Sequence, residues 1–349
     1  MGRRPKRIRI TDRTAVYHCI SRILRQEPFL QEPDKERLNS LIKRQAAFAG
    51  IQILTHCIMG NHLHILLRIP IEEGLTLAQH REKQTDDEIL KRCVAFYGDS
   101  SDEVIKLKDE ITSLGKFSDN TRSRLLERMY ELSAFMKELK KNFTDWFNHT
   151  HGREGILWRE RFKSIVVDEN SEALGIVARY IDLNPVRASM KDDPKDYRWC
   201  GYAQAVAGDE SARKGISHIE KCETWAEASE LYRMKLFSKA GQSNHSDKRA
   251  LSDEEVEKVL GERGKLSEHQ LVLVRTRYFI DGVAIGTSAF TDEIFAKFRD
   301  RFGATRKSGA RPIPYLEHPP LTTLRNLLRS EEHTSELQSP CNLVCRLLL

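Results

Sequence analysis

A short turn between two strand-like runs restricts the possible folds of this chain more than any other feature of the sequence. The runs IQILTHCIM (51–59) and HLHILLRI (62–69) are rich in β-branched and aliphatic residues, and only Gly60 and Asn61 separate them. Such runs favour strands, and a connection this short favours a tight hairpin. The sequence therefore predicts an antiparallel pair of strands over residues 51–69.

Further elements follow from the spacing of apolar residues on both sides of the hairpin. Residues 14–23 alternate apolar and polar side chains as a half-buried strand does, and 161–169 is a second strand candidate. Helical patterns cover 34–49, ended by Gly50, and 172–184, opened by Ser171 and ended by Pro185. A long charged helical segment fills about 75–151. This order favours an α+β fold, with an antiparallel sheet and helices on one face.

Changes in composition along the 349 residues suggest where the parts begin and end. We expect a basic arm at 1–13, one domain over 14–207 with a helical insertion at about 75–150, a linker at 208–249 and a helical region at 250–328. Residues 329–349 include RSEEHTSELQS, which resembles a translated sequencing-library adapter. We therefore exclude this segment from fold reasoning and expect the natural sequence to end near Leu328.

Charge and cysteine content indicate a partner class and a compartment. The net charge is only +6, but six basic residues fall within 3–13 and five within 299–311. Such clusters neutralise phosphates or form solvated segments. No run approaches the roughly 18 apolar residues of a membrane span, and no apolar run follows the basic N-terminus. Seven cysteines without a C-x-x-C pair fit a reducing cytoplasm, so we expect a cytoplasmic protein without a membrane partner.

His62 and His64 are the first candidates for chemistry. Residues two apart on a strand point to the same face, so both imidazoles project together and make a metal site plausible. The pattern is also met in surface or core histidines. A zinc-stabilised module that adds His56 and Cys57 is another interpretation, although structural zinc sites usually pair two separated ligand clusters.

Tyr180 and Asn184 share one face of the helix at 172–184, because they lie four residues apart. Packed over the sheet, that helix could bring a phenol and a carboxamide oxygen beside the two histidines. The alternatives are a half-buried aromatic residue and a helix cap before Pro185.

These residues, in this order, resemble the REP-associated tyrosine transposases, which are single-tyrosine HUH enzymes with an IS200-like transposase domain. The matching segments are YHCISR (17–22), NHLH (61–64), GILWRERFKSIVV (155–167) and RYIDLNPVRASMKDDPKDYRWCGY (179–202). They cover roughly 13–205, and the region 287–311 is similar to C-terminal extensions in some branches of the family. The segment 75–150 is longer and more charged than a minimal member needs.

The resemblance implies a ferredoxin-like HUH nuclease fold and a mechanism. His62, His64 and Asn184 would hold a divalent ion, Mg²⁺ or Mn²⁺, and Tyr180 would attack the scissile phosphodiester to form a 5′-phosphotyrosine and a free 3′-OH. The substrate would be single-stranded DNA beside hairpins or palindromes, in a bacterial cytoplasm. Candidate DNA contacts are Arg22, Trp158, Arg159, Arg161, Lys163, Arg187, Arg306 and Lys307.

Three questions stay open at the level of sequence. A domesticated protein that binds hairpins without cutting them, or a relaxase or replication-initiator nuclease of the wider HUH class, would carry similar residues. The protein would act as a monomer or a homodimer, and the tyrosine could serve its own subunit or a partner. The Y-I-x-x-N-P-V-R-A run at 180–188 favours the transposase branch.

Overall fold

The structure, a computed structural model, describes residues 7–24, 29–237, 277–303, 306, 308–313 and 321–325. These residues form both helices and strands, which confirms the α+β class. Internal contacts divide the chain into two compact units, here called the N-terminal unit (9–162) and the C-terminal unit (163 onward, with 7–8). The boundary at 162–163 falls inside the range 14–207 that we expected to form one domain. The ferredoxin-like arrangement stays a prediction.

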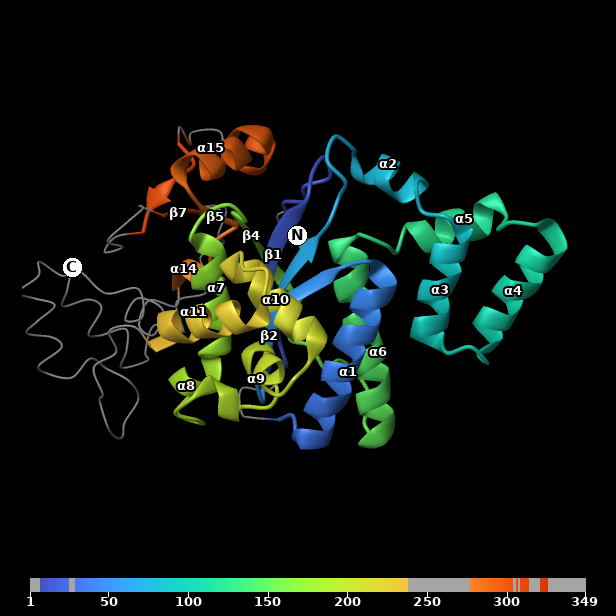
Figure 1. Ribbon diagram of the computed structural model, residues 1–349, viewed down its shortest axis with the longest axis horizontal. Coiled ribbons are helices and arrows are strands. Elements are labelled where there is room, and N and C mark those ends of the chain that lie inside the picture. The colour runs from blue at the N-terminus through green and yellow to red at the C-terminus, as the bar shows by residue number, and fades with distance from the viewer. Residues whose placement is uncertain are drawn as a thin grey trace, which may run out of the picture. The chain divides into compact units, whose positions relative to one another are not determined.

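The N-terminal unit is a small antiparallel sheet followed by helices (Figure 1). In chain order its elements are β1 (Ala15–Arg22), α1 (Glu32–Ala49), β2 (Gln52–Ile58), β3 (His62–Ile69), α2 (Leu77–Glu82), α3 (Asp86–Tyr97), α4 (Asp102–Leu114), α5 (Asp119–Leu126) and α6 (Leu132–Thr150). The predicted hairpin is confirmed as β2–β3, and β1 pairs with the other edge of β3. Strand β3 is therefore held by hydrogen bonds on both sides, which fixes the register of its side chains.

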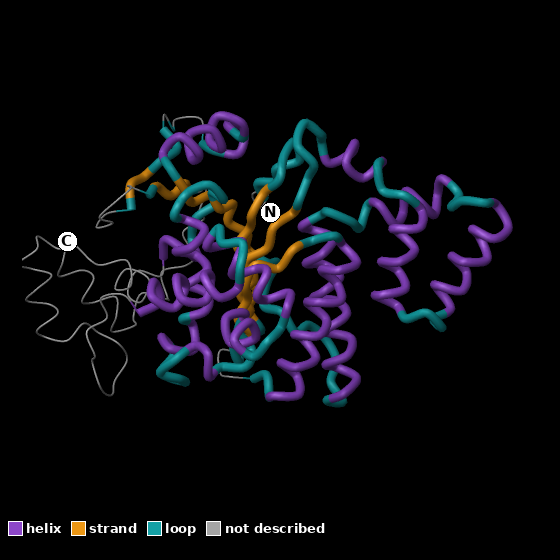
Figure 2. The backbone as a smooth tube through the Cα atoms, in the orientation of Figure 1, coloured by secondary structure: helices purple, strands orange, loops and turns teal. Residues whose placement is uncertain are grey.

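Helices α1 and α6 close the core of this unit. They pack side by side, and α1 also contacts β2 (Figure 2). Leu38, Ile42 and Phe48 of α1 are fully buried, as are Phe135 and Phe143 of α6. The apolar stripe of the charged helical segment therefore forms core, as helical spacing indicates.

Gly50 ends α1 as the sequence predicts. Its φ of 67° lies in the left-handed region, and a Cβ at this position would collide with the ring of Tyr130. Tyr130 follows α5, and its backbone N–H donates to the carbonyl of Ala49 at 2.7 Å. The end of α1 is thus hydrogen-bonded to the segment that follows α5.

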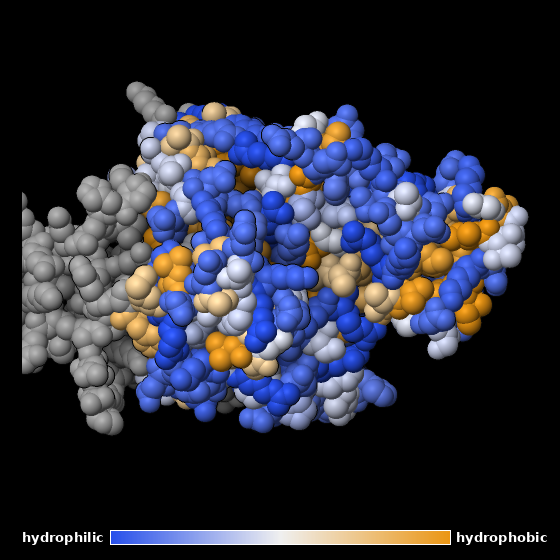
Figure 3. All heavy atoms as spheres, viewed as in Figure 1, coloured by the Kyte–Doolittle hydropathy of each residue, from blue (hydrophilic) through white to orange (hydrophobic). Residues whose placement is uncertain are grey.

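The insertion helices expose part of their apolar surface. The side chains of Ile105 and Leu114 on α4 are 46% and 60% exposed. Figure 3 shows hydrophobic side chains gathered where α4 and α5 lie.

The expected basic arm is partly structured, because Ile10 is buried and its N–H donates to Tyr17 Oη at 2.8 Å. Residues 1–6 lie outside the described part of the chain.

The C-terminal unit combines helices with a sheet of short strands. Its described elements are β4 (Lys163–Val167), α7 (Ala173–Asp182), α8 (Asn184–Arg187), η1 (Pro194–Asp196), α9 (Gly201–Val206), α10 (Glu210–Glu220), α11 (Trp225–Phe237), α14 (Arg277–Ile280), β5 (Ala284–Gly286), α15 (Ser288–Lys297), η2 (Arg299–Arg301), β6 (Arg311–Pro312) and β7 (Thr322–Leu324). Strand β5 pairs in parallel with β4 and antiparallel with β7, and β6 pairs with the other edge of β7.

Two expectations about this unit are corrected. The range 208–249, expected to be a linker, contains α10 and α11, which bury Ile216, Ile219, Tyr232 and Leu236 against the unit. Apolar residues at helical spacing, separated by charged ones, therefore build core there. The range 250–328 is not purely helical, since three strands lie in its described portion from 277 on. Residues 238–276 and 326–349, including the adapter-like segment, fall outside the described residues.

Within the described ranges, no helix is both long enough and apolar enough to cross a membrane.

Candidate functional site

The histidine pair lies on β3 of the N-terminal unit. His62 and His64 project from one face, with ring centroids 5.1 Å apart and ring planes nearly perpendicular at 85°. The intervening Leu63 is buried on the opposite face. Register places Arg22 of β1 opposite His62 and Ile20 opposite His64. The spacing of two along a strand thus brings the imidazoles together, as the sequence indicates.

Asn61 orients the first of these histidines. His62 Nδ1 lies 2.7 Å from Asn61 Oδ1, at the end of the hairpin turn. An amide oxygen only accepts hydrogen bonds, so Nδ1 of His62 carries the hydrogen in this contact. The neutral ring then keeps its lone pair on Nε2.

His18 on β1 contacts the second histidine and was not among the predicted site residues. His18 Nε2 lies 2.8 Å from His64 Nδ1, and the two rings stack with centroids 5.1 Å apart. Both side chains are almost completely buried. The tyrosine–histidine pair in YHCISR marked this strand, but only the strand register shows which histidine faces which.

The zinc interpretation does not fit this sheet. His56 on β2 pairs with Ile65, so it lies on the opposite face from His62 and His64. Among the described residues, no three His, Cys, Asp or Glu side chains gather as a metal site. His56 therefore does not share a face with His62 and His64, which lie on one face of β3 together with His18 of β1.

Tyr180 lies on α7 of the C-terminal unit, all ten residues of which are buried. The high apolar content of ALGIVARYID explains this burial. Leu183 lies between α7 and the short helix α8, whose second residue is Pro185. The phenol ring of Tyr180 stacks on Phe279 of α14 at a centroid distance of 4.7 Å. Tyr180 is therefore held between helices of its own unit.

Arg187 connects Tyr180 to Asn184. Its Nη2 donates to Asn184 Oδ1 at 2.9 Å and lies 3.5 Å from Tyr180 Oη, while the guanidinium sits 4.3 Å from the centre of the tyrosine ring. Asn184 Nδ2 donates in turn to the backbone carbonyls of Tyr180 and Ile181. The expected helix-face pair is present, and Arg187 bonds to Asn184 and lies against Tyr180, while its contact with DNA stays a prediction.

This arrangement engages the atom that Asn184 would offer to an ion. Its carbonyl oxygen Oδ1 accepts from Arg187, which leaves one further lone pair on that oxygen. The histidine pair and Tyr180 belong to different units, and each group is described within its own unit.

The other predicted DNA contacts divide into exposed and packed side chains. Arg159 and Arg161 are exposed and Arg22 is half-buried. Lys163 is partly exposed, with Nζ 3.9 Å from Asp281 Oδ1. Residues 157–159 bond to the end of β1, where Arg159 N–H donates to the carbonyl of Arg22. In the N-terminal unit, basic side chains therefore lie at the end of β1 that pairs with His62.

Two of the expected contacts have partners within the protein. Trp158 is 9% exposed, and its Nε1 donates to the carbonyl of Lys140 on α6. Arg306 donates to the backbone carbonyls of Ser308, Gly309 and Arg325. Burial and the nearby Arg311 and Arg299 lower the pKa of Arg306. The contact of both side chains with DNA stays a prediction. Lys307 lies outside the described residues.

A comparison with known protein families finds a match for part of the chain. Residues 12–94 match the family model described as "Transposase IS200 like", a range that contains His18, His62 and His64. This match confirms the resemblance to an IS200-like transposase domain that the sequence motifs predict.

One solved structure and one negative result complete the comparison. A structure of a REP-associated tyrosine transposase bound to a REP hairpin is similar at 13% identity and a TM-score of 0.34, over 58% of this chain and 86% of that chain. None of the curated proteins compared with this chain matches it.

Proposed function

We propose that this protein is a metal-dependent DNA transposase that cleaves single-stranded DNA beside hairpins through a covalent tyrosine intermediate and rejoins the strands. The observation that carries the proposal is the imidazole pair of His62 and His64, on one face of a strand within the family-matched segment. The mild excess of positive charge fits a nucleic-acid partner. The proposed setting is the bacterial cytoplasm.

His62 and His64 fit a divalent ion by their donor chemistry. Two neutral imidazoles suit Mn²⁺ at least as well as Mg²⁺, and Asn184 Oδ1 would use its second lone pair or exchange its bond with Arg187. The bound ion would supply Lewis-acid polarisation of the scissile phosphodiester. In this proposal, the two histidines bind the ion and hold it at one face of β3.

Tyr180 is the proposed nucleophile. Its Oη attacks the scissile phosphorus, a new Tyr180 O–P bond forms, and the bond from phosphorus to the 3′ oxygen breaks. The phenol loses its proton and the departing 3′ oxygen gains one, giving a 5′-phosphotyrosine and a free 3′-OH. Attack by a 3′-OH of another strand end reverses the step and restores the phenol. Because the phosphodiester energy is kept in the covalent bond, strand transfer needs no nucleotide cofactor.

Arg187 is suited to support this attack. Its guanidinium lies over the ring of Tyr180 and close to the oxygen that becomes negative when the phenol loses its proton. Positive charge at that position stabilises the anionic oxygen. The bond to Asn184 fixes the guanidinium in place. Arg22, Arg159 and Arg161 are the proposed backbone-phosphate contacts.

A covalent-trapping assay tests the proposal. Single-stranded DNA that carries a palindrome from the flank of the gene, labelled at its 3′ end, is incubated with protein and Mn²⁺, and the products are separated under denaturing conditions. We expect label on the native protein, none with Tyr180→Phe, and none with EDTA. Hairpin binding by Tyr180→Phe should stay within about twofold of wild type, because a single hydroxyl is lost.

Tyr202→Phe is the matched control, because Tyr202 is a buried tyrosine of the same unit that accepts one hydrogen bond from Arg233. This variant should form the adduct at the native level. An undiminished adduct with Tyr180→Phe would refute the assignment of the nucleophile. Tight hairpin binding by the native protein without any adduct would indicate a binding protein that does not cut.

A further inference from the structure

We propose that His18 is a positioning residue that fixes the tautomer of His64, so that His64 Nε2 carries the lone pair offered to the ion. The proposal rests on the proposed function for the ion itself. The observation behind the proposal, however, is a contact between the side chains of His18 and His64. No role for His18 follows from the spacing of the N-H-x-H motif.

The contact between His18 and His64 is short, buried and held by regular structure. His18 Nε2 and His64 Nδ1 are 2.8 Å apart, within ordinary hydrogen-bond range. His18 is 0% exposed and His64 is 3% exposed. β1 and β3 pair in unbroken register from Ala15–Ile69 to Arg22–His62, with His18 opposite Leu66 and Ile20 opposite His64. The two histidines are therefore diagonal neighbours on one face, a position that the backbone ladder maintains.

Only one direction of this hydrogen bond is compatible with a ligand role for His64. A neutral imidazole has one N–H and one lone pair. If His64 Nδ1 donates to His18 Nε2, the lone pair of His64 lies on Nε2. If His18 donates instead, His64 must carry its hydrogen on Nε2, and that atom cannot bind an ion.

The neighbouring histidine follows the same rule through a different partner. Asn61 Oδ1 can only accept, so His62 Nδ1 donates and its lone pair also lies on Nε2. With His18 as acceptor, both Nδ1 atoms donate to protein groups and both Nε2 atoms carry the lone pair. Hydrogen bonds of this kind to the second ring nitrogen orient metal-binding histidines, and their loss typically lowers metal affinity about 10- to 100-fold.

Two substitutions separate an acceptor role from mere space filling. In His18→Gln, a carboxamide oxygen can reach the position of Nε2 and accept from His64 Nδ1–H. In His18→Leu, the volume is retained but no acceptor remains. Tyr17→Phe is the matched control, because Tyr17 is the adjacent buried residue on β1 and its hydroxyl bonds to Ile10 N–H rather than to a histidine. Circular dichroism and thermal unfolding establish that each variant is folded.

The first readout is Mn²⁺ affinity of the full chain, measured by titration calorimetry and by the electron paramagnetic resonance signal of unbound Mn²⁺. We expect His18→Leu to bind Mn²⁺ about 10- to 100-fold more weakly, and His18→Gln to bind within about threefold of wild type. Tyr17→Phe should match wild type. Native affinity in folded His18→Leu, or equal weakening in His18→Gln and His18→Leu, would overturn the proposal.

The second readout does not depend on any ion. The ¹⁵N shifts of His64 in the metal-free protein distinguish a hydrogen on Nδ1 from one on Nε2. We expect Nδ1–H in wild type and His18→Gln, and a shift toward Nε2–H in His18→Leu. A wild-type His64 with its hydrogen on Nε2 would overturn the proposal. If the tautomers are as expected but wild type binds no Mn²⁺, the role of His18 stands and the proposed metal dependence fails.

Discussion

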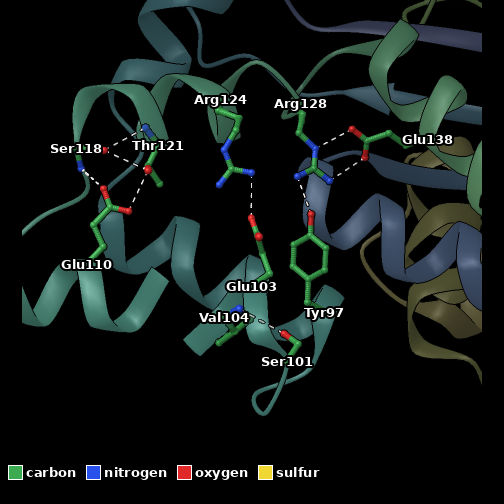
Figure 4. A network of polar contacts seen from close by, with 10 residues as sticks. All are labelled: Tyr97, Ser101, Glu103, Val104, Glu110, Ser118, Thr121, Arg124, Arg128 and Glu138. Carbon is green, nitrogen blue, oxygen red and sulfur yellow. Dashed lines mark hydrogen bonds and ion pairs between the residues drawn. The ribbon is translucent and has the colours of Figure 1, made fainter. Parts of the chain in front are cut away.

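Two polar networks hold helices in place, one in each unit, and they differ in how far they are removed from water. Behind α7 of the C-terminal unit, charged groups are buried: the side chains of Arg179 and Glu220 are 2% and 1% exposed. Among the insertion helices of the N-terminal unit, the ion pairs lie at the surface or are partly covered (Figure 4). Arginine–carboxylate pairs are therefore buried in one network and accessible to water in the other.

The buried network fixes the helix that carries Tyr180. Glu220 of α10 lies between Arg179 of α7, at 3.4 Å, and Lys235 of α11, at 2.6 Å. Tyr232 of α11 donates to Asp182 at 2.5 Å. Burial, followed by the nearby Asp182 carboxylate, raises the pKa of Tyr232 well above its ordinary value. Each buried charge needs its partner, so α7 has few alternative positions.

The insertion network joins several helices by contacts of smaller individual value. Arg128 binds Glu138 of α6 and the Tyr97 hydroxyl of α3, and Arg124 of α5 binds Glu103 of α4 (Figure 4). Water competes for most of these groups, which reduces the net energy of each pair. The comparison teaches that burial, rather than the number of ion pairs, decides which network determines geometry.

The largest effect is expected from Glu220→Gln. The substitution leaves Arg179 buried without its carboxylate, and breaking a buried pair in this way costs about 3–5 kcal/mol of stability. Urea unfolding of the full chain measures this loss. Because α7 also loosens, adduct formation should slow while hairpin binding persists.

Glu227→Gln is the control for this experiment, since Glu227 is an exposed carboxylate on α11. It should change the free energy of unfolding by less than about 0.5 kcal/mol. Equal stabilities for Glu220→Gln and Glu227→Gln would break the comparison between the two networks.

An intermediate effect is expected from Arg128→Lys. Arg128 donates to both carboxylate oxygens of Glu138, at 2.7 and 3.0 Å, and to Tyr97 Oη at 2.7 Å, and its guanidinium lies 4.5 Å from the centre of the Phe48 ring. Lysine keeps the charge but loses the planar fork, which should cost about 1–2 kcal/mol. Thermal unfolding measures the change. A lysine variant as stable as wild type would mean that charge alone is what this position needs.

The smallest effect is expected at the Arg124–Glu103 pair. The two side chains are 49% and 35% exposed, so their coupling should stay below about 1 kcal/mol. A double-mutant cycle with Arg124→Ala and Glu103→Ala, run at low and high salt, measures it. The coupling should shrink as salt is added. A coupling of several kcal/mol that ignores salt would place this pair with the buried network instead.

The sequence predicts the elements whose signals are local. The hairpin, β1, α1 with its Gly50 end and α7 ending before Pro185 all occur close to the expected ranges. The projection of His62 and His64 from one face follows from the two-residue period of a strand. These features depend on neighbours within a few positions, which is the range over which spacing and turn residues carry information.

The contacts that the sequence does not predict are those set by register or by long-range pairing. His18 meets His64 across 46 positions, and the match depends on how β1 aligns with β3. Arg187 lies seven residues after Tyr180 and three after Asn184, which is the spacing of one helix face, but spacing alone does not show that its guanidinium bonds to both side chains. Strands β5 to β7 span two or three residues each, too short for any period to appear.

The pairing of β4 with β5 has a consequence for the order in which the chain can assemble. The strands of the N-terminal unit, β1 to β3, have all been synthesised by residue 69. The partner of β4 within the C-terminal unit, β5, arrives only at residues 284–286 and is itself flanked by β7 at 322–324. Contacts so distant along the chain form late and slowly. On the ribosome, the strand that carries His62 and His64 therefore meets its partners in the N-terminal unit well before β4 meets β5, and the proposed ion ligands are in place long before the unit of the proposed nucleophile can be completed.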